Sequence, residues 1–170
     1  TDAIIPNLEG IAQHRRGQFD SAVVNFRTAV QIDGESAVYR RNLALALLEL
    51  GEEEEAVDHL RRAVELDPTF LLAQYDLGRG LLAVGDTTGS LEWLENFADR
   101  SSNVRDLSPA RIAAISAIRR IRTAQAEAQA QTEVTPTPED SFVDSVVLPD
   151  LPELPAPDVV VPVVPAQGND

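Results

Sequence analysis

Residues 39–68 read YRRNLALALLELGEEEEAVDHLRRAVELDP and contain two helices with their stop signals. The first twelve residues are apolar on nearly all sides, which indicates a helix that contacts neighbours on several sides. Gly51 ends this helix, and the acidic run after it opens a second helix that continues to Asp67-Pro68. Glycine after one helix and proline after the next are typical stop signals. The stretch therefore predicts a pair of helices.

The pattern of this pair recurs along the first hundred residues at a fixed spacing. Glycines stand at positions 17, 51 and 85, at equal spacing along the chain. We call this spacing the repeat interval. Three more columns keep the same spacing: Gly10, Ala44 and Gly78; Ala22, Ala56 and Ser90; Phe26, Leu60 and Leu94. A fixed period in several residue types indicates a repeat protein whose units stack on one another.

These segments resemble tetratricopeptide repeats, a family of helix pairs that recur every ~34 residues. The columns that match the family are the small residue of the first helix (Gly10, Ala44, Gly78), the alanine of the second (Ala22, Ala56) and the closing alanine and proline (Ala63, Pro68). The first repeat has Gly34 in place of the proline, and the third has Ser90 in place of the alanine. The resemblance covers about residues 3–102. It implies an all-α solenoid of about three helix pairs.

A further helix is expected to follow the third repeat and to cap the stack. Ser108 followed by Pro109 is a typical helix start, and the helix should extend to about Ala130. The isoleucines expected to pack on the third repeat are Ile112, Ile115, Ile118 and Ile121. The alternative is a basic amphipathic helix on a membrane surface. A narrow stripe without aromatic residues favours the cap.

Composition divides the chain near Gln131. Residues 1–131, the expected repeat domain with its capping helix, hold all 14 cationic side chains and 20 acidic ones. Residues 132–170 hold eight acids, no cation and eight of the 11 prolines. A segment with that composition does not form a core of its own, so we expect an extended acidic tail.

Leucine–proline pairs recur in this tail every three residues, at Leu148, Leu151 and Leu154. Three residues is the period of a polyproline helix. One interpretation is a stiff spacer, and the other is a recognition strip with an aliphatic and an acidic edge. In the second interpretation the residues expected to contact a partner are Phe142, Val146, Val147, Leu148, Leu151 and Leu154.

Charge and residue usage argue against several functional classes. The net charge of −14 repels nucleic acid and anionic lipid, so we expect neither as a partner. The absence of cysteine excludes disulfides and thiolate chemistry. His14 and His59 fall in different repeats and lack a metal-ligand spacing. No apolar run approaches the roughly 20 residues that span a bilayer. We therefore expect no enzyme, no cofactor, no metal and no membrane span.

The resemblance implies a concave groove, lined by the first helices of successive repeats, that binds extended peptides or helices. The residues on this face are Ile4, Asn7, Ile11, His14, Val38, Arg41, Leu45, Leu48, Leu72, Tyr75, Arg79 and Leu82. An exposed aliphatic patch of this kind usually marks a binding surface. The alternative is that a partner segment, the capping helix or the tail covers it permanently.

Chaperone-binding members of the family clamp a C-terminal carboxylate with lysines, asparagines and an arginine. The corresponding residues here are Asn7, Ile11, Asn42, Leu72 and Asp76, of which only Asn42 agrees. The resemblance therefore implies a more apolar ligand than an acidic C-terminus.

The function we expect is a non-enzymatic scaffold, an accessory subunit of a larger bacterial complex. The repeats would dock one protein subunit and the tail would lie along another, on apolar and arginine-containing surfaces; a membrane protein is one candidate. The start at Thr1, the lack of cysteine and the long tail favour a periplasmic location, with the cytoplasm as the alternative. The alternative function is a transient adaptor or co-chaperone that binds an apolar peptide in the groove.

Overall fold

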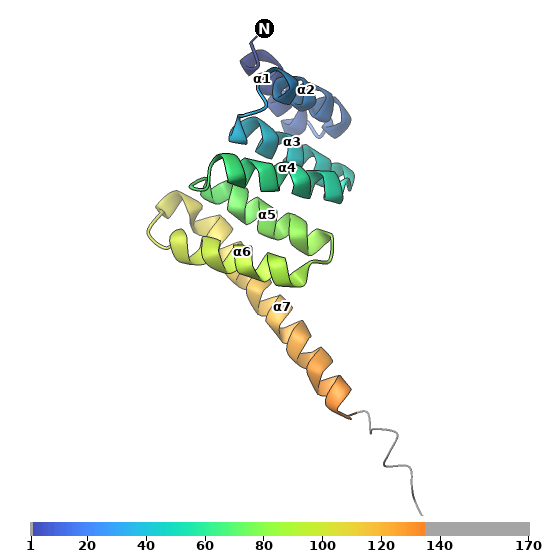
Figure 1. The fold of residues 1–170 in the computed structure, drawn as a ribbon, viewed down its shortest axis with the longest axis vertical. Helices are drawn as coiled ribbons and strands as arrows, with labels where there is room; N and C mark the ends of the chain where they lie inside the picture. The colour runs from blue at the N-terminus through green and yellow to red at the C-terminus, as the bar shows by residue number, and fades with distance from the viewer. Residues whose placement is uncertain (1, 135–170) are drawn as a thin grey trace, which may run out of the picture. The chain divides into compact units, whose positions relative to one another are not determined.

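The computed structural model describes residues 2–134, and this part of the chain is helical throughout apart from short turns. Its helices stack in sequence order, each beside the one before it (Figure 1). They are α1 (Ile4–Arg15), α2 (Phe19–Ile32), α3 (Ala37–Leu50), α4 (Glu53–Leu66), α5 (Leu71–Ala83), α6 (Thr87–Arg100), the short 3₁₀ helix η1 (Arg105–Leu107) and α7 (Ser108–Val134). The expected all-α solenoid of three helix pairs and a capping helix is confirmed.

The three glycines that mark the repeat interval end the first helix of each pair. Gly17, Gly51 and Gly85 adopt φ values of 73°, 78° and 84°, a left-handed conformation that side-chain-bearing residues rarely take. At Gly51 this conformation turns the chain so that the Glu52 amide donates to the carbonyl of Leu47 (3.0 Å). The glycines therefore recur because the turn between paired helices requires them.

The small residue in the first helix of each pair has a steric cause. A Cβ added at Gly10 would lie 2.7 Å from the ring of Phe26, and one added at Gly78 would lie 2.8 Å from Leu94. Both large side chains come from the second helix and are buried. Each pair therefore packs a large residue of one helix against a small residue of the other.

Helix α7 covers α6, but not with the isoleucine stripe that we expected. The buried residues are Ala114 and Ile121, whereas Ile112 is 66% and Ile115 46% exposed. At about 100° per residue, a stripe with a constant spacing of three drifts around the helix. Positions 112 and 121 therefore lie on opposite sides, and the expectation of one apolar stripe was wrong.

Helix α7 also runs beyond the stack. Arg119 stands one repeat interval after Gly85, so no glycine stops the helix where the earlier first helices end. Residues 123–131 alternate alanine with polar residues, mostly glutamine, and both types favour helix without help from a neighbour. Figure 1 shows the resulting projection past α6. The tail and its six candidate contact residues lie outside the described residues, and the boundary near Gln131 stays a prediction.

Candidate functional site

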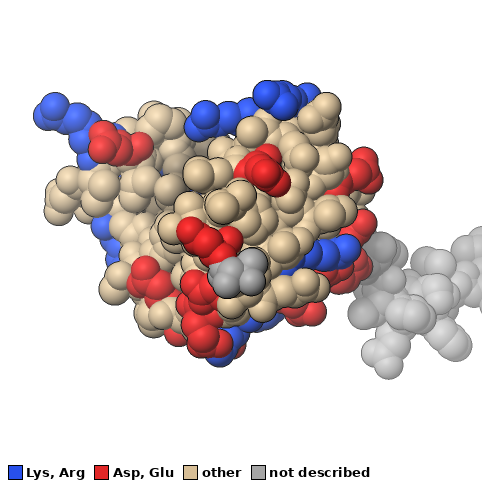
Figure 2. Space-filling view, turned by 90° about the horizontal axis from the view of Figure 1, so that it is seen from above, with Lys and Arg blue, Asp and Glu red and all other residues tan. Residues whose placement is uncertain are grey.

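The candidate site is the face formed by the first helices α1, α3 and α5, called here the groove face. Neighbouring first helices contact one another along it. Of the twelve expected residues, Ile4, Val38, Arg79 and Leu82 are exposed, Ile11, His14, Arg41, Leu45, Leu48, Leu72 and Tyr75 are half-buried, and Asn7 is buried. Viewed from the α1 end of the stack, the surface in Figure 2 is uncharged over wide areas but carries several acidic side chains, with basic side chains along its edges. The groove face is thus mostly apolar and partly open.

One hollow in this face lies between α1 and α3. It has a volume of about 140 Å³, and Ile11, His14, Phe26 and Leu45 line it together with Arg15. Asn42 stands at its edge and donates from Nδ2 to Oδ1 of Asn7 at 2.9 Å. Asn7 therefore joins the two helices and offers little surface to a ligand.

A second hollow lies between α5 and α7. It has a volume of about 360 Å³, and Tyr75, Arg79 and Leu82 line it together with Ala113 and Ala117 of α7. The sequence analysis missed the two alanines. The repeat register could have found them, because Ala113 follows Arg79 by one repeat interval. The capping helix extends the groove face instead of closing it.

Between the two hollows a buried carboxylate holds both arginines of the face. The Nε of Arg41 donates to Oδ2 of Asp76 at 2.6 Å, and Arg79 lies 3.5 Å from the other carboxylate oxygen. Asp76 is only 2% exposed. Burial raises the pKa of the Asp76 carboxyl above its ordinary value, and the two arginines oppose that rise. The guanidinium groups also lie over aromatic rings, Arg41 over Phe70 and Arg79 over Tyr75.

The Asp76 carboxylate thus offsets one of the two positive charges that the sequence places on the face. A ligand with a carboxylate would have to compete with Asp76 for Arg41 and Arg79. An apolar ligand would meet aliphatic and aromatic side chains in both hollows. The geometry therefore suits apolar segments better than acidic ones.

The described residues contain neither a metal-binding cluster nor a helix suited to span a membrane. Among them there is no group of three or more histidine, cysteine or acidic side chains that could hold a metal ion. Within the same part of the chain no helix has the length and apolar character needed to cross a membrane.

A comparison with known protein families identifies the repeats. Residues 14–69 match the family described as Tetratricopeptide repeat. The helix pairs within this segment are tetratricopeptide repeats. The matched segment includes two of the glycine turns and the second helix pair. A comparison with curated protein sequences gives no match.

Solved tetratricopeptide repeat structures share the fold at low sequence identity. The first such domain of Spaghetti (RPAP3), bound to the HSP90 peptide SRMEEVD, is 20% identical, covers 74% of this chain and 94% of its own, and has a TM-score of 0.66. The Yersinia enterocolitica type III secretion chaperone SycD, in complex with a peptide of the translocator YopD, is 13% identical, with coverages of 71% and 92% and a TM-score of 0.67. The Sgt2 domain from Aspergillus fumigatus is 21% identical, with coverages of 85% and 91% and a TM-score of 0.67.

Proposed function

We propose that this repeat protein is a non-enzymatic interaction module whose groove face binds an apolar segment of a protein partner. The observation that carries the proposal is the pair of apolar hollows separated by the Arg41–Asp76 ion pair. Two hollows on one face favour an extended segment or a helix that places an apolar side chain in each.

Two further observations support a peptide ligand, and the first of them favours an apolar one. The face lacks the set of cations that clamps a C-terminal carboxylate, and Asp76 holds Arg41 and Arg79. Two structural neighbours, Spaghetti and SycD, were solved with peptides bound. By analogy, peptide binding is the use that we propose for this fold here.

Selection from a random peptide library displayed on phage tests this function with the full chain as bait. We expect the recovered peptides to carry two or more large aliphatic or aromatic residues and few acids. Leu45→Glu and Leu82→Glu, one in or beside each hollow, should each weaken binding at least tenfold. Val24→Glu is the matched control, because Val24 is 63% exposed on α2, outside the first helices.

Two results would contradict the proposal. One is recovery of peptides that end in acidic residues. The other is binding that neither groove variant weakens.

The wider setting that we propose is an accessory subunit of a larger bacterial complex on the periplasmic side, with the acidic tail lying along a second subunit. The rival is a transient adaptor or co-chaperone that exchanges partners through the groove. Purification from the native source under mild detergent separates the two, because a permanent subunit co-purifies at fixed stoichiometry and an adaptor is recovered free.

A further inference from the structure

Helix α7 occupies the place of the first helix of a fourth repeat. In α5, Gly80 lies against Val57 and Leu60 of the preceding second helix, α4. Ala114 follows Gly80 by one repeat interval and is fully buried in the cluster that contains Leu94 of α6. The repeat register therefore continues into α7 without interruption.

Among the described residues, no helix covers the other side of α7. In the third helix pair, the Leu94 side chain of α6 covers Gly78 of α5. Leu81 of α5 is 1% exposed. The residues one repeat interval later are Ile112 and Ile115, which are 66% and 46% exposed. No second helix follows α7 within residues 2–134. Ile112 and Ile115 are therefore exposed where a second helix covers the earlier repeats.

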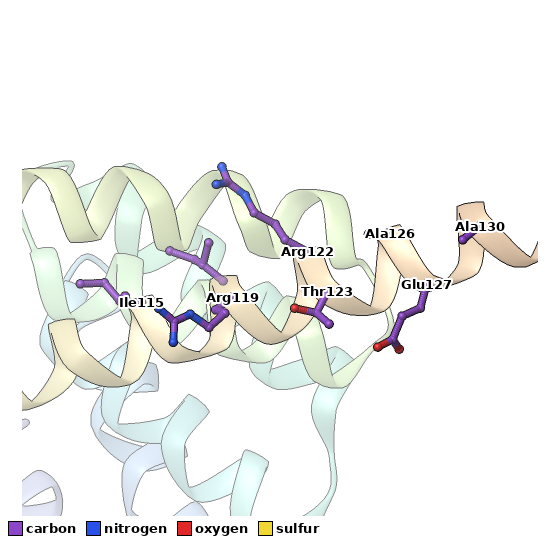
Figure 3. A pocket seen from close by; sticks show the side chains of 8 residues that line it. Ile115, Arg119, Arg122, Thr123, Ala126, Glu127 and Ala130 are labelled. Carbon is purple, nitrogen blue, oxygen red and sulfur yellow. The ribbon is translucent and has the colours of Figure 1, made fainter.

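This outer face continues along the projecting part of α7. After the two isoleucines it includes Arg119, Ala126 and Ala130, at spacings of three, four or seven residues that keep them on one side of the helix. Glu127 borders the strip beside the alanines. Figure 3 shows Ile115, Arg119, Ala126 and Ala130 in sequence along the helix. The face is thus a helix-long strip with isoleucines at one end and alanines at the other.

The charge around this strip selects the class of occupant. From residue 108 to 132 α7 carries Arg111, Arg119, Arg120 and Arg122 and a single acid, Glu127. Arg122 already pairs with Glu95 of α6 at 2.7 Å, whereas Arg119 and Arg120 are exposed. A second copy of α7 would set arginines against arginines. An acidic helix would pair with them.

We propose that the outer face of α7 binds an acidic amphipathic helix of a partner protein, which takes the place that the second helix holds in the earlier repeats. At this site the large residue belongs to the first helix, whereas in the earlier repeats it belongs to the second helix. Ile112 stands where Gly10, Ala44 and Gly78 accept a large residue from the second helix. The partner helix therefore has to present a small residue opposite Ile112, since two large side chains would hold the helices apart.

A peptide with the sequence of residues 52–67 is a suitable probe of this class. It has seven acids and two arginines, and in the protein it forms a helix that buries Ala56, Val57, Leu60, Ala63 and Val64 on one side. Two of these five residues are alanines, which leave room for a large side chain opposite them. We expect the fluorescently labelled peptide to bind the full chain in an anisotropy titration.

The variants that locate the binding keep the helix and change its faces. Ile115→Glu should weaken binding at least tenfold, because it removes apolar contact and adds a like charge. Ala124→Glu is the matched control, since it adds the same charge to an exposed position nine residues away, on the opposite side of α7. It should change the affinity less than threefold. Replacing Glu52 to Glu55 of the peptide with lysine should weaken binding at least tenfold.

Several outcomes would overturn the proposal. Absence of binding, or binding that Ile115→Glu leaves unchanged, would show that the strip does not receive such a helix. Loss of binding in Leu45→Glu would move the site to the groove face. Dimers of the full chain in sedimentation that Ile115→Glu dissociates would identify a second copy as the occupant. Tighter peptide binding after Leu148, Leu151 and Leu154 are replaced by serine would identify the tail.

Discussion

Nε of Arg41 and Oδ2 of Asp76 lie 2.6 Å apart and join α3 to α5 beneath the groove face. The carboxylate side chain is 3% exposed and the arginine side chain 19%. The pair therefore does two things at once: it links neighbouring repeats, and it withholds a cation from any ligand in the groove.

Asp76→Asn should convert the groove face to one that accepts acidic peptides. Without the carboxylate, Arg41 and Arg79 lose their counter-ion, and the face gains one positive charge. We expect the acidic peptide SRMEEVD to bind the variant at least tenfold more tightly than the unmodified chain, by calorimetric titration. Asp99→Asn, a change of equal charge at an exposed site in α6, is the control. Equal affinities for the variant and the unmodified chain would show that Asp76 does not govern ligand charge.

Gly78→Ala should destabilise the fold more than Gly80→Ala, although both lie in α5. The new Cβ at position 78 would lie 2.8 Å from fully buried Leu94, and the one at position 80 would lie 3.1 Å from Val57. Alanine gains about 1 kcal/mol of helix propensity at both sites, whereas overpacking costs about 1–3 kcal/mol. We expect a net loss of about 1–2 kcal/mol at position 78 and a change within about 0.5 kcal/mol at position 80. Urea denaturation measures both, and the reverse order would contradict the packing argument.

Ile121→Asp should cost roughly 3 kcal/mol or more, because Ile121 is 7% exposed against α6 and the variant buries a carboxylate. Ile115→Asp should cost less than about 1 kcal/mol, because Ile115 is 46% exposed. The two midpoints of chemical denaturation, followed by helical circular dichroism, give the comparison. If the variants lost equal stability, the orientation assigned to α7 would be incorrect.

The stability of the fold should fall in mild acid in part through His59. Burial lowers the pKa of His59 below 6.5, nearby Arg40 adds to the shift, and Glu55 opposes it from 3.6 Å. Between the lowered pKa and about 6.5 the unfolded chain binds more protons than the folded one. The free energy of unfolding therefore decreases as the pH falls below about 6.5.

Denaturation curves at about pH 8 and about pH 5 test this contribution. In His59→Gln the difference between the two pH values should be smaller than in the unmodified chain. Identical differences would show that His59 contributes nothing to the acid sensitivity.

The sequence was sufficient to predict the helix pairs because their turns depend on backbone geometry that few residues tolerate. Gly51 is required by a left-handed turn, and Gly78 by the approach of Leu94. Such constraints require the same residue type at the same position of each repeat. Because the chain contains three repeats, the spacing can be read from its sequence alone.

The sequence was a poorer guide to α7 and to the centre of the groove. Apolar character alone selected the isoleucines, whereas alanines such as Ala114 make the close contacts with α6. The link between Arg41 and Asp76 depends on side-chain direction across two helices, which a sequence does not display. For the same reason the sequence pattern predicts both arginines on the face but not the buried acid that holds them.

Each helix packs mainly on the helices next to it in sequence, so the array resembles a one-dimensional chain of coupled units. Opening therefore starts at the ends, and the amide hydrogens of α3 to α5 should exchange with solvent most slowly. A ligand at one end slows exchange in the helices that it touches and in their immediate neighbours, and its effect fades over the repeats beyond. Occupancy of α7 and events at α1 can thus be controlled separately within one molecule.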